Sequence, residues 1–311
     1  MTAKLLPLLV LLTLSYVPCP SHGRCLGPLG TTPSIRDIVR GRCEIYQQFV
    51  NPDAFCDNRK STKRNCSEVT ETFIKSFSHR KQCNISLGSF DNFVRLTRHD
   101  VTSIKRLFWT GVYSIVHKYS RATSRMVTLE DTMTGYLIDG LRFCAQSDDP
   151  GMIFGSDCPG FSDTSSCPWN AEYSFWASAS KNFACEARGE ASLMINASRS
   201  PAFIANSFFA TWEVPNLSSS LSKLNILMVT IPGEDKKETC GSDSILALKS
   251  LLTDKNITSS CTDEPTDVLS VLCLDHLEKE VCRRLLVITS SQSSNQLSSC
   301  IIFISILALL M

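Results

Sequence analysis

Apolar residues recur at two different periods along this chain. Residues 34–50 and 67–77 place them about every three or four positions, which is typical of an amphipathic helix. Residues 173–183 follow the same period and are predicted to be helical. Further along, residues 192–195 and 223–231 are short apolar runs with β-branched residues, typical of buried strands. The pattern therefore predicts a mainly helical first part and a sheet in the second.

The order of the later elements indicates how that sheet is built. Residues 242–252 are predicted to form a helix, and residues 268–274 another strand. Strand, helix and strand in succession favour a parallel α/β layer. We therefore expect an α+β fold with a mostly helical lobe, an α/β lobe with a short parallel sheet, and a site in the cleft between them. The expected bounds are 26–101 and 128–187 for the helical lobe, and 102–127 and 188–289 for the α/β lobe.

A capping pattern, Thr128-Leu-Glu-Asp131, precedes a run with helical spacing. It predicts a helix that starts at Thr128, with the Asp131 carboxylate reaching back to free backbone N–H groups. Glu130 and Asp131 would then lie in the first turn, where the helix dipole favours carboxylates. Taken alone, they can be capping charges only; a functional role needs further support.

Both ends of the chain carry patterns typical of targeting signals. Lys4 is followed by an apolar run over 5–17 and small residues over 21–23, which indicates a secretory signal peptide over 1–23. Residues 290–299 are polar and residues 300–311 apolar, too few for a span of about 20 residues. This pattern favours a GPI-attachment signal over 290–311 and a protein on the outer face of the plasma membrane. An apolar end that docks on the domain is the alternative. The candidate attachment residues are Ser290, Ser291, Ser293, Ser294 and Asn295.

Cysteine usage agrees with secretion. The chain has fifteen cysteines, thirteen of them between the two terminal signals, and a secreted chain is expected to use these in disulfides. Zinc is the weaker alternative, because histidine is rare and no CxxC pair occurs. Thirteen is odd, and Cys25 is the expected unpaired residue. Five glycosylation sequons predict a glycoprotein. They begin at Asn65, Asn84, Asn196, Asn216 and Asn256.

Four motifs together carry a resemblance. They are Trp109-Thr-Gly, Thr128-Leu-Glu-Asp-Thr-Met-Thr-Gly-Tyr136, Phe175-Trp176 with Ser180, and Phe208-Phe-Ala-Thr-Trp-Glu-Val214. Over nearly the whole mature chain, the sequence resembles the ADP-ribosyl cyclase/NAD glycohydrolase family, in particular its GPI-anchored members. The resemblance implies an extracellular enzyme that cleaves the nicotinamide–ribosyl bond of NAD to give ADP-ribose, cyclic ADP-ribose and nicotinamide. It implies no metal and no cofactor, because NAD is the substrate.

The resemblance assigns roles to residues. Glu213 would be the catalytic carboxylate, which stabilises or traps the positive charge that develops on ribose. Trp109 and Trp176 would flank the flat rings of the substrate. Trp169 and Trp212 match no family site and are expected in the core or at the rim. The remaining substrate-binding residues would be Glu130 and Asp131 at the nicotinamide amide, Asp139 nearby, Ser180 at the ribose or phosphates, and Phe208.

Departures from the family pattern add further expectations. Phe208 stands five residues before Glu213, as in the mollusc enzyme that mainly cyclises, which implies a detectable cyclase fraction. Gly111 replaces a basic residue that some members place near the phosphates, so Lys105, Arg106 or backbone groups would contact them. The extra cysteines Cys56 and Cys185 are candidates to pair with each other. The family pattern implies the bridges Cys43–Cys66, Cys83–Cys167, Cys144–Cys158, Cys240–Cys261 and Cys273–Cys282.

Two other classes of function remain open. One is a GPI-anchored surface receptor or adhesion protein of the same fold with weak or no catalysis; the joint presence of Glu213, Trp176 and Glu130 argues against it. The other is a growth-factor-like disulfide scaffold, which the length of the chain disfavours. A net charge of +1 gives no nucleic-acid signature. The expected partners are therefore NAD, the membrane through the anchor, and a second copy in a homodimer.

Overall fold

The computed structural model describes residues 34–57, 60–61, 63–99, 105–144, 155, 157–275 and 282. The predicted signal peptide (1–23), Cys25 and the GPI-attachment signal (290–311) lie outside these residues. Of the described helices, none combines the length and the hydropathy needed to cross a bilayer.

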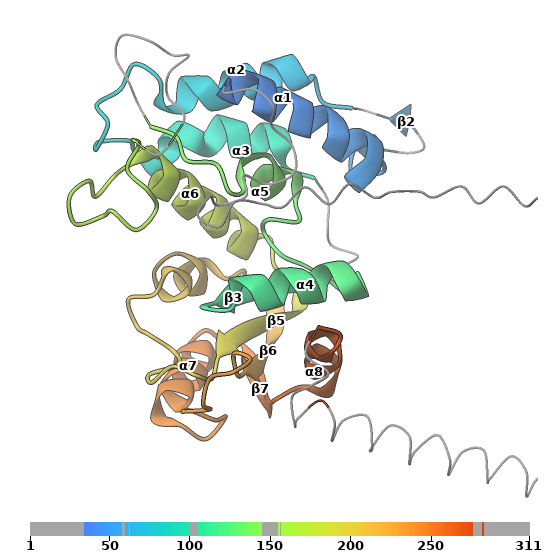
Figure 1. Ribbon diagram of the computed structural model, residues 1–311, viewed down its shortest axis with the longest axis vertical. Helices are drawn as coiled ribbons and strands as arrows, with labels where there is room; N and C mark the ends of the chain where they lie inside the picture. Colours follow the sequence, from blue (N-terminus) through green and yellow to red (C-terminus); the bar gives the residue numbers. More distant parts are fainter. Residues whose placement is uncertain are drawn as a thin grey trace, which may run out of the picture.

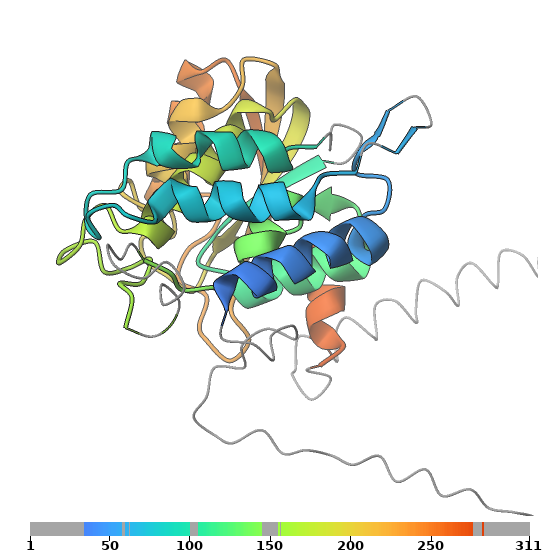
Figure 2. The same cartoon turned by 90° about the horizontal axis from the view of Figure 1, so that it is seen from above.

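Helices form one half of the molecule and a parallel sheet with its own helices forms the other (Figure 1). Seen from above, α1 and α2 run side by side (Figure 2). The helical half comprises α1 (Ile35–Ile45), the π-helix η1 (Tyr46–Val50), α2 (Cys66–Phe77), the 3-10 helix η2 (Leu87–Phe90), α3 (Asp91–Thr97), α5 (Met133–Ile138) and α6 (Ala171–Cys185), with a small hairpin of β1 (Cys56–Asp57) and β2 (Lys60–Ser61).

Polar side chains fix where the long helices begin. The Asn65 side-chain oxygen accepts hydrogen bonds from the Ser67 and Glu68 backbone N–H groups, at 3.0 and 3.3 Å, at the start of α2. Asn170 caps α6 in the same way through the Tyr173 N–H, at 2.8 Å. Such caps satisfy N–H groups that have no partner within the helix. The predicted helices over 34–50, 67–77 and 173–183 are confirmed, each within a few residues of its expected bounds.

The sheet has five parallel strands in the order β4-β3-β5-β6-β7. The predicted parallel layer is therefore confirmed, and so is the helix expected over 242–252. The elements of this half are β3 (Lys105–Thr110), α4 (Tyr113–Thr123), β4 (Met126–Val127), β5 (Gly189–Asn196), the π-helix η3 (Phe209–Glu213), the 3-10 helix η4 (Val214–Asn216), β6 (Leu221–Val229), α7 (Asp243–Asp254), β7 (Thr258–Asp263) and α8 (Thr266–Cys273).

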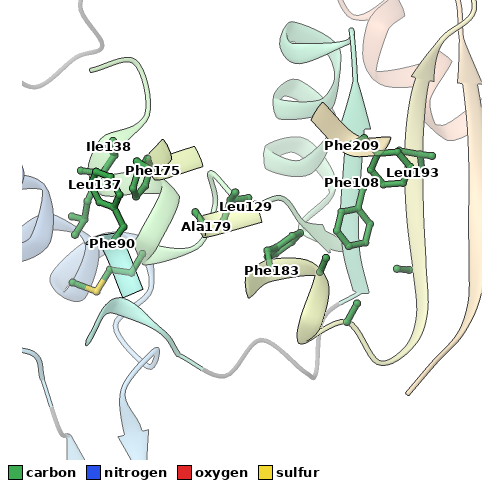
Figure 3. Packing of buried hydrophobic residues seen from close by; sticks show 14 of the residues in the cluster. Phe90, Phe108, Leu129, Leu137, Ile138, Phe175, Ala179, Phe183, Leu193 and Phe209 are labelled. Atoms are coloured by element: carbon green, nitrogen blue, oxygen red, sulfur yellow. The ribbon is translucent and has the colours of Figure 1, made fainter. Parts of the chain in front are cut away.

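Alternate residues of the central strands face two different cores, as the pleat requires. Leu107 and Met194 pack with α4 and α8 on one face of the sheet. Phe108 and Leu193 face the other way, into a core that continues unbroken into the helical half. Figure 3 shows Phe183 between the sheet side of this core, at Phe108, and the helical side, at Phe175. The division into two lobes at the bounds expected from sequence stays a prediction, because a single hydrophobic core runs through both.

Six buried phenylalanines hold the helical half together, and we call them the phenylalanine cluster. Phe73 of α2 lies at its centre, with ring centroids 5.0–6.4 Å from the rings of the other five. Tilted and edge-on contacts at such distances are favourable beyond the burial of apolar area. The members of the cluster are Phe73, Phe77, Phe90, Phe93, Phe143 and Phe175.

The five disulfides implied by the family pattern are all present: Cys43–Cys66, Cys83–Cys167, Cys144–Cys158, Cys240–Cys261 and Cys273–Cys282. The suggested bridge between Cys56 and Cys185 is wrong, because Cys185 ends α6 as an exposed free thiol.

Two predicted elements differ from the structure. Residues 268–273 belong to α8 and not to a strand, and Leu274 is its C-cap, because Val268, Val271 and Leu272 recur at helical spacing and pack in the same core as α4. The helix expected from Thr128 starts later, at Met133, with Thr132 as its N-cap. Residues 129–132 fold over its first turn so closely that a Cβ on Gly135 would lie 2.3 Å from the Leu129 carbonyl oxygen.

The sequons differ in exposure. Asn65, Asn84 and Asn256 are exposed. Asn216 is half-buried, and its amide nitrogen donates to the Trp212 carbonyl at 2.9 Å. Asn196 is 4% exposed and its Nδ2, the atom to which a glycan would attach, donates to the Gly111 carbonyl at 3.2 Å. The structure therefore argues against Asn196 as a glycosylation site.

Candidate active site

A cavity of about 430 Å³ lies between the helical half and the sheet. Volumes of this order suit a small-molecule ligand. The walls come from the carboxyl end of β3, the residues before α5 and at its end, α6, and η3. In parallel α/β sheets, ligands bind outside the carboxyl ends of the strands. The cavity brings together all but one of the site residues expected from sequence, namely Glu213, Trp109, Trp176, Glu130, Asp139, Ser180 and Phe208.

Glu213 is the more perturbed of two buried carboxyl groups in the cavity. It ends the π-helix η3, a type of turn that is frequent at functional sites, and is 8% exposed. Burial, together with the nearby charge of Glu130, raises the pKa of Glu213 to about 8, even though a hydrogen bond from the Ser180 side chain opposes the shift. A carboxyl group whose charge is disfavoured by burial therefore lines the cavity.

Glu130 is the second carboxyl group. Its side chain is 9% exposed, and burial raises its pKa to about 7. The charge of Asp139 adds to this rise, while a hydrogen bond from the Trp109 indole N–H, at 3.3 Å, opposes it. Because two nearby carboxylates repel each other, the pair favours a single negative charge near neutral pH.

His117 of α4 lies behind Glu130. Its Nε2 is 4.0 Å from the Glu130 Oε2 atom, and neither ring nitrogen has a hydrogen-bond partner within the part of the chain that the structure describes. Burial lowers the pKa of His117, so the imidazole is neutral at physiological pH. The group that lies against Glu130 is therefore a neutral imidazole ring and not a cation.

Two indole rings come from opposite sides of the cavity. Trp109 is near the end of β3, and Trp176 lies on α6; both are partly exposed. The edge of Tyr113 lies against Trp109, with ring centroids 5.6 Å apart. Flat aromatic faces can stack on planar rings and attract a cationic one. The geometry therefore suits a flat, positively charged group between the two halves of the molecule.

Asp139 is held at the end of α5. Its carboxylate accepts a hydrogen bond from the Tyr113 hydroxyl, at 3.0 Å to Oδ2. Its backbone carbonyl accepts another from Arg42 Nη1, at 2.7 Å, which also contacts the carbonyls of Tyr136 and Leu137. A buried cation thus satisfies the carbonyls that end the helix, and Asp139 is fixed at the cavity wall.

Asp131 does not line the cavity, contrary to the role that the resemblance implied. Its Oδ2 atom accepts hydrogen bonds from the backbone N–H and the hydroxyl of Thr128, both at 2.9 Å. The carboxylate therefore shapes the turn that presents Glu130. It accepts from the Thr128 N–H as the capping pattern predicted, but no helix begins there.

An aromatic wall closes the other side of the cavity. Phe208 lies 4.8 Å from Phe161 and 5.6 Å from Tyr173, measured between ring centroids. Trp212 donates from its indole N–H to the Tyr173 hydroxyl at 3.0 Å, and Trp169 packs near it, so both lie beyond the lining residues, at the rim.

Some lining residues escaped the sequence analysis. Phe161, Glu172 and Tyr113 all line the cavity. Phe161 sits in an irregular loop between Cys158 and Cys167, where no periodicity signals its direction. The sequence offered one signal that this loop lies near the site: its two cysteines form disulfides with Cys144 and Cys83, which hold the loop against the helical half.

Arg106 and Lys105, the two cations expected near the phosphates, do not face the cavity. Arg106 is buried and donates to the Phe183 carbonyl at 3.0 Å and to Glu186 at 3.1 Å. Lys105 is exposed and pairs with Glu190 at 2.6 Å. Neither residue lines the cavity. The structure therefore argues against phosphate contacts by these two residues, because each is already paired. The expected contacts by backbone groups stay a prediction.

Comparison with known proteins identifies the family that the sequence motifs resemble. The family model described as ADP-ribosyl cyclase matches residues 32–282. The ADP-ribosyl cyclase/cyclic ADP-ribose hydrolase of Aplysia californica is 32% identical over 254 residues, which are 81% of this chain and 87% of that protein. The crystal structure of Aplysia cyclase complexed with substrate NGD and product cGDPR has a TM-score of 0.71 and 31% identity, over 81% of this chain and 97% of that one. Porcine CD38 complexed with a covalent intermediate, ribo-F-ribose-5'-phosphate, has a TM-score of 0.67 and 28% identity, over 76% of this chain and 98% of that one.

Proposed function

Because the chain belongs to the ADP-ribosyl cyclase family, we propose that it cleaves the nicotinamide–ribosyl bond of NAD and releases nicotinamide, ADP-ribose and cyclic ADP-ribose. The observation that carries the proposal is Glu213, a buried carboxyl group in a cavity flanked by two indole rings. A carboxyl group in such a place costs stability, and a chemical role accounts for it.

The chemistry matches the residues present. When the bond breaks, its electron pair moves to the pyridinium nitrogen, and nicotinamide leaves as a neutral base without a general acid. Positive charge then develops on the ribose carbon. A carboxylate at Glu213 stabilises this charge or forms a bond to that carbon, as in retaining glycosidases. The covalent intermediate named for the porcine CD38 structure supports the second course.

Substrate binding and ionisation of Glu213 are coupled in this proposal. In the empty cavity the pKa of about 8 keeps much of the carboxyl group protonated at neutral pH. A cationic nicotinamide ring next to it favours the charged form, so binding lowers this pKa and releases a proton. Trp109 and Trp176 hold the ring there, and Glu130 and Asp139 face its polar edge.

The second step decides the product. Attack by water gives ADP-ribose and a proton, whereas attack by the adenine ring on the same carbon gives cyclic ADP-ribose. Phe208 supports a substantial cyclase fraction, because together with Phe161 and Tyr173 it forms an aromatic wall on which adenine can stack.

The test is to incubate the secreted form, ending near residue 289, with NAD and to separate the products by chromatography. Glu213→Gln keeps the shape of the side chain and removes its charge, and we expect nicotinamide release to fall about a thousandfold or more. Glu190→Gln is the control and is expected to match the unmodified protein, because the Glu190 side chain is 41% exposed, pairs with Lys105 and does not line the cavity. No release from a folded, disulfide-complete protein would move the assignment to a surface receptor of the same fold.

The location of the enzyme is part of the proposal. We place it at the outer face of the plasma membrane, held by a GPI anchor and glycosylated at the exposed Asn65, Asn84 and Asn256. The five disulfides support an oxidising compartment. Phosphatidylinositol-specific phospholipase C should release the protein from cells, and retention would exclude the anchor. Light scattering on the released protein tests the expected homodimer.

A further inference from the structure

Gly111 lines the cavity, and the Arg199 side chain lies against it, next to the lining residues and not among them. Gly111 follows β3, lines the cavity and has a φ of +71°, a region that favours glycine. A Cβ at this position would lie 2.7 Å from Arg199 Nη1 and 2.8 Å from its Cζ. The Arg199 guanidinium therefore occupies the space that a side chain at residue 111 would need.

Hydrogen bonds fix the segment that carries Arg199. Asn196, the last residue of β5, donates from Nδ2 to the Gly111 carbonyl at 3.2 Å and accepts from the Ser198 N–H at 2.8 Å. The Ser198 hydroxyl accepts from the Ile231 N–H at 3.0 Å. On the other side, the Ser200 hydroxyl donates to Glu238 at 3.0 Å. Arg199 thus projects from a loop that is tied down on both sides.

The charge of Arg199 is available to a ligand. Its side chain is exposed, and across the described ranges it forms no ion pair or hydrogen bond. Lys105 and Arg106, in contrast, are paired with carboxylates and lie away from the cavity. A guanidinium presents a fork of donors that matches phosphate oxygens. It also stands at the carboxyl ends of β3 and β5, the edge at which parallel sheets bind ligands.

We propose that Arg199 binds the diphosphate of the dinucleotide substrate, taking the space opened by the absent side chain of Gly111. This inference rests on the proposed function, because it concerns the same cavity. The two residues act as a unit: glycine at 111 lets the arginine lie against the cavity wall, and the arginine supplies the positive charge.

Equilibrium binding tests the inference without turnover. Isothermal titration calorimetry would compare ADP-ribose, which carries the diphosphate, with nicotinamide, which does not. For Arg199→Gln we expect the Kd of ADP-ribose to rise tenfold or more, as for loss of a charge-assisted hydrogen bond, and that of nicotinamide to stay unchanged. Arg199→Lys should recover part of the affinity. Arg188→Gln is the matched control, because Arg188 is also exposed but precedes β5, roughly 23 Å away along the strand.

Kinetics with NAD add a second readout. The KM of Arg199→Gln should rise with little change in kcat, and its dependence on salt should weaken. Gly111→Ala should also weaken ADP-ribose binding, and by less when Arg199 is already Gln. The inference is overturned if Arg199→Gln binds ADP-ribose like Arg188→Gln, or if it loses nicotinamide equally. Absence of nicotinamide release by the unmodified protein would instead overturn the proposed function.

Discussion

Two interiors of this molecule are lined by aromatic side chains and serve opposite purposes. In the phenylalanine cluster, rings contact rings, and Phe73 is completely buried. In the cavity, Trp109, Trp176 and Phe208 surround open space and two buried carboxyl groups. The first arrangement stabilises the fold. The second leaves apolar surface uncovered and raises the pKa of Glu213 and Glu130, which costs stability.

This difference separates residues that hold the fold from residues that use it. Substitutions in the phenylalanine cluster should change the free energy of unfolding and affect activity only through loss of folded protein. Substitutions in the cavity should change activity while stability is kept or even increased. The predictions that follow challenge this separation, beginning with the largest effect.

Phe73→Ala should lower the free energy of unfolding by about 3–5 kcal/mol, because it removes the ring at the centre of the cluster and leaves a cavity. Denaturant titration with the disulfides intact would measure the change. Phe73→Leu keeps most of the volume and should cost clearly less. A loss below about 1 kcal/mol for the alanine variant would mean that the cluster relaxes around the gap and is not the rigid core described here.

Glu213→Gln should stabilise the protein at alkaline pH. The folded-state pKa of about 8 lies above the usual 4.5, so stability is full below pH 4.5, falls between pH 4.5 and pH 8, and levels off above pH 8. Glutamine resembles the protonated form and avoids this fall. We expect a gain on the order of 2–4 kcal/mol at pH 9 and little at pH 5.

Thermal or denaturant unfolding at both pH values would measure this gain. Glu190→Gln serves as the exposed control and should not reproduce it. Equal stability of Glu213→Gln and the unmodified protein at pH 9 would show that Glu213 is not held in an environment that disfavours its charge.

Glu130→Gln should shift the pH dependence of activity. The free enzyme needs Glu213 as a carboxylate, so kcat/KM should rise with pH toward about 8. Glu130 raises the pKa of Glu213 through its own charge. Removing that charge should move the rise in kcat/KM to lower pH, by up to about one pH unit. Initial rates of nicotinamide release between pH 5 and 9 would reveal the shift, and an unmoved profile would uncouple the two groups.

Phe208→Thr should have the smallest effect on stability, within about 1 kcal/mol, because the Phe208 ring is only partly buried. It should nevertheless reduce the ratio of cyclic ADP-ribose to ADP-ribose, since the aromatic wall loses the ring nearest Phe161. Chromatography of the products at equal NAD conversion is the measurement. If the ratio stays the same, Phe208 does not position adenine.

Local periodicity predicted most helices and the parallel layer, because an amphipathic face repeats with the geometry of its element. It failed where packing overrode the local pattern. The polar edge strand β7 was missed because one neighbouring strand, and not a buried face, defines it. The segment 266–273 was taken for a strand because a short apolar run does not distinguish strand from helix.

Motifs in the sequence identified the family. The resemblance to that family implied the five disulfide pairs and seven residues that line the cavity, but it missed Phe161, Glu172 and Tyr113. Tertiary structure alone decided which charges face the cavity. Asp131 and Arg106 form hydrogen bonds that hold the fold. Arg199, which no motif singled out, lies against Gly111 of the cavity wall. The physical reason is that the direction of a side chain depends on partners that are distant in sequence. Gly111 meets Arg199 only once β3 and β5 pair side by side.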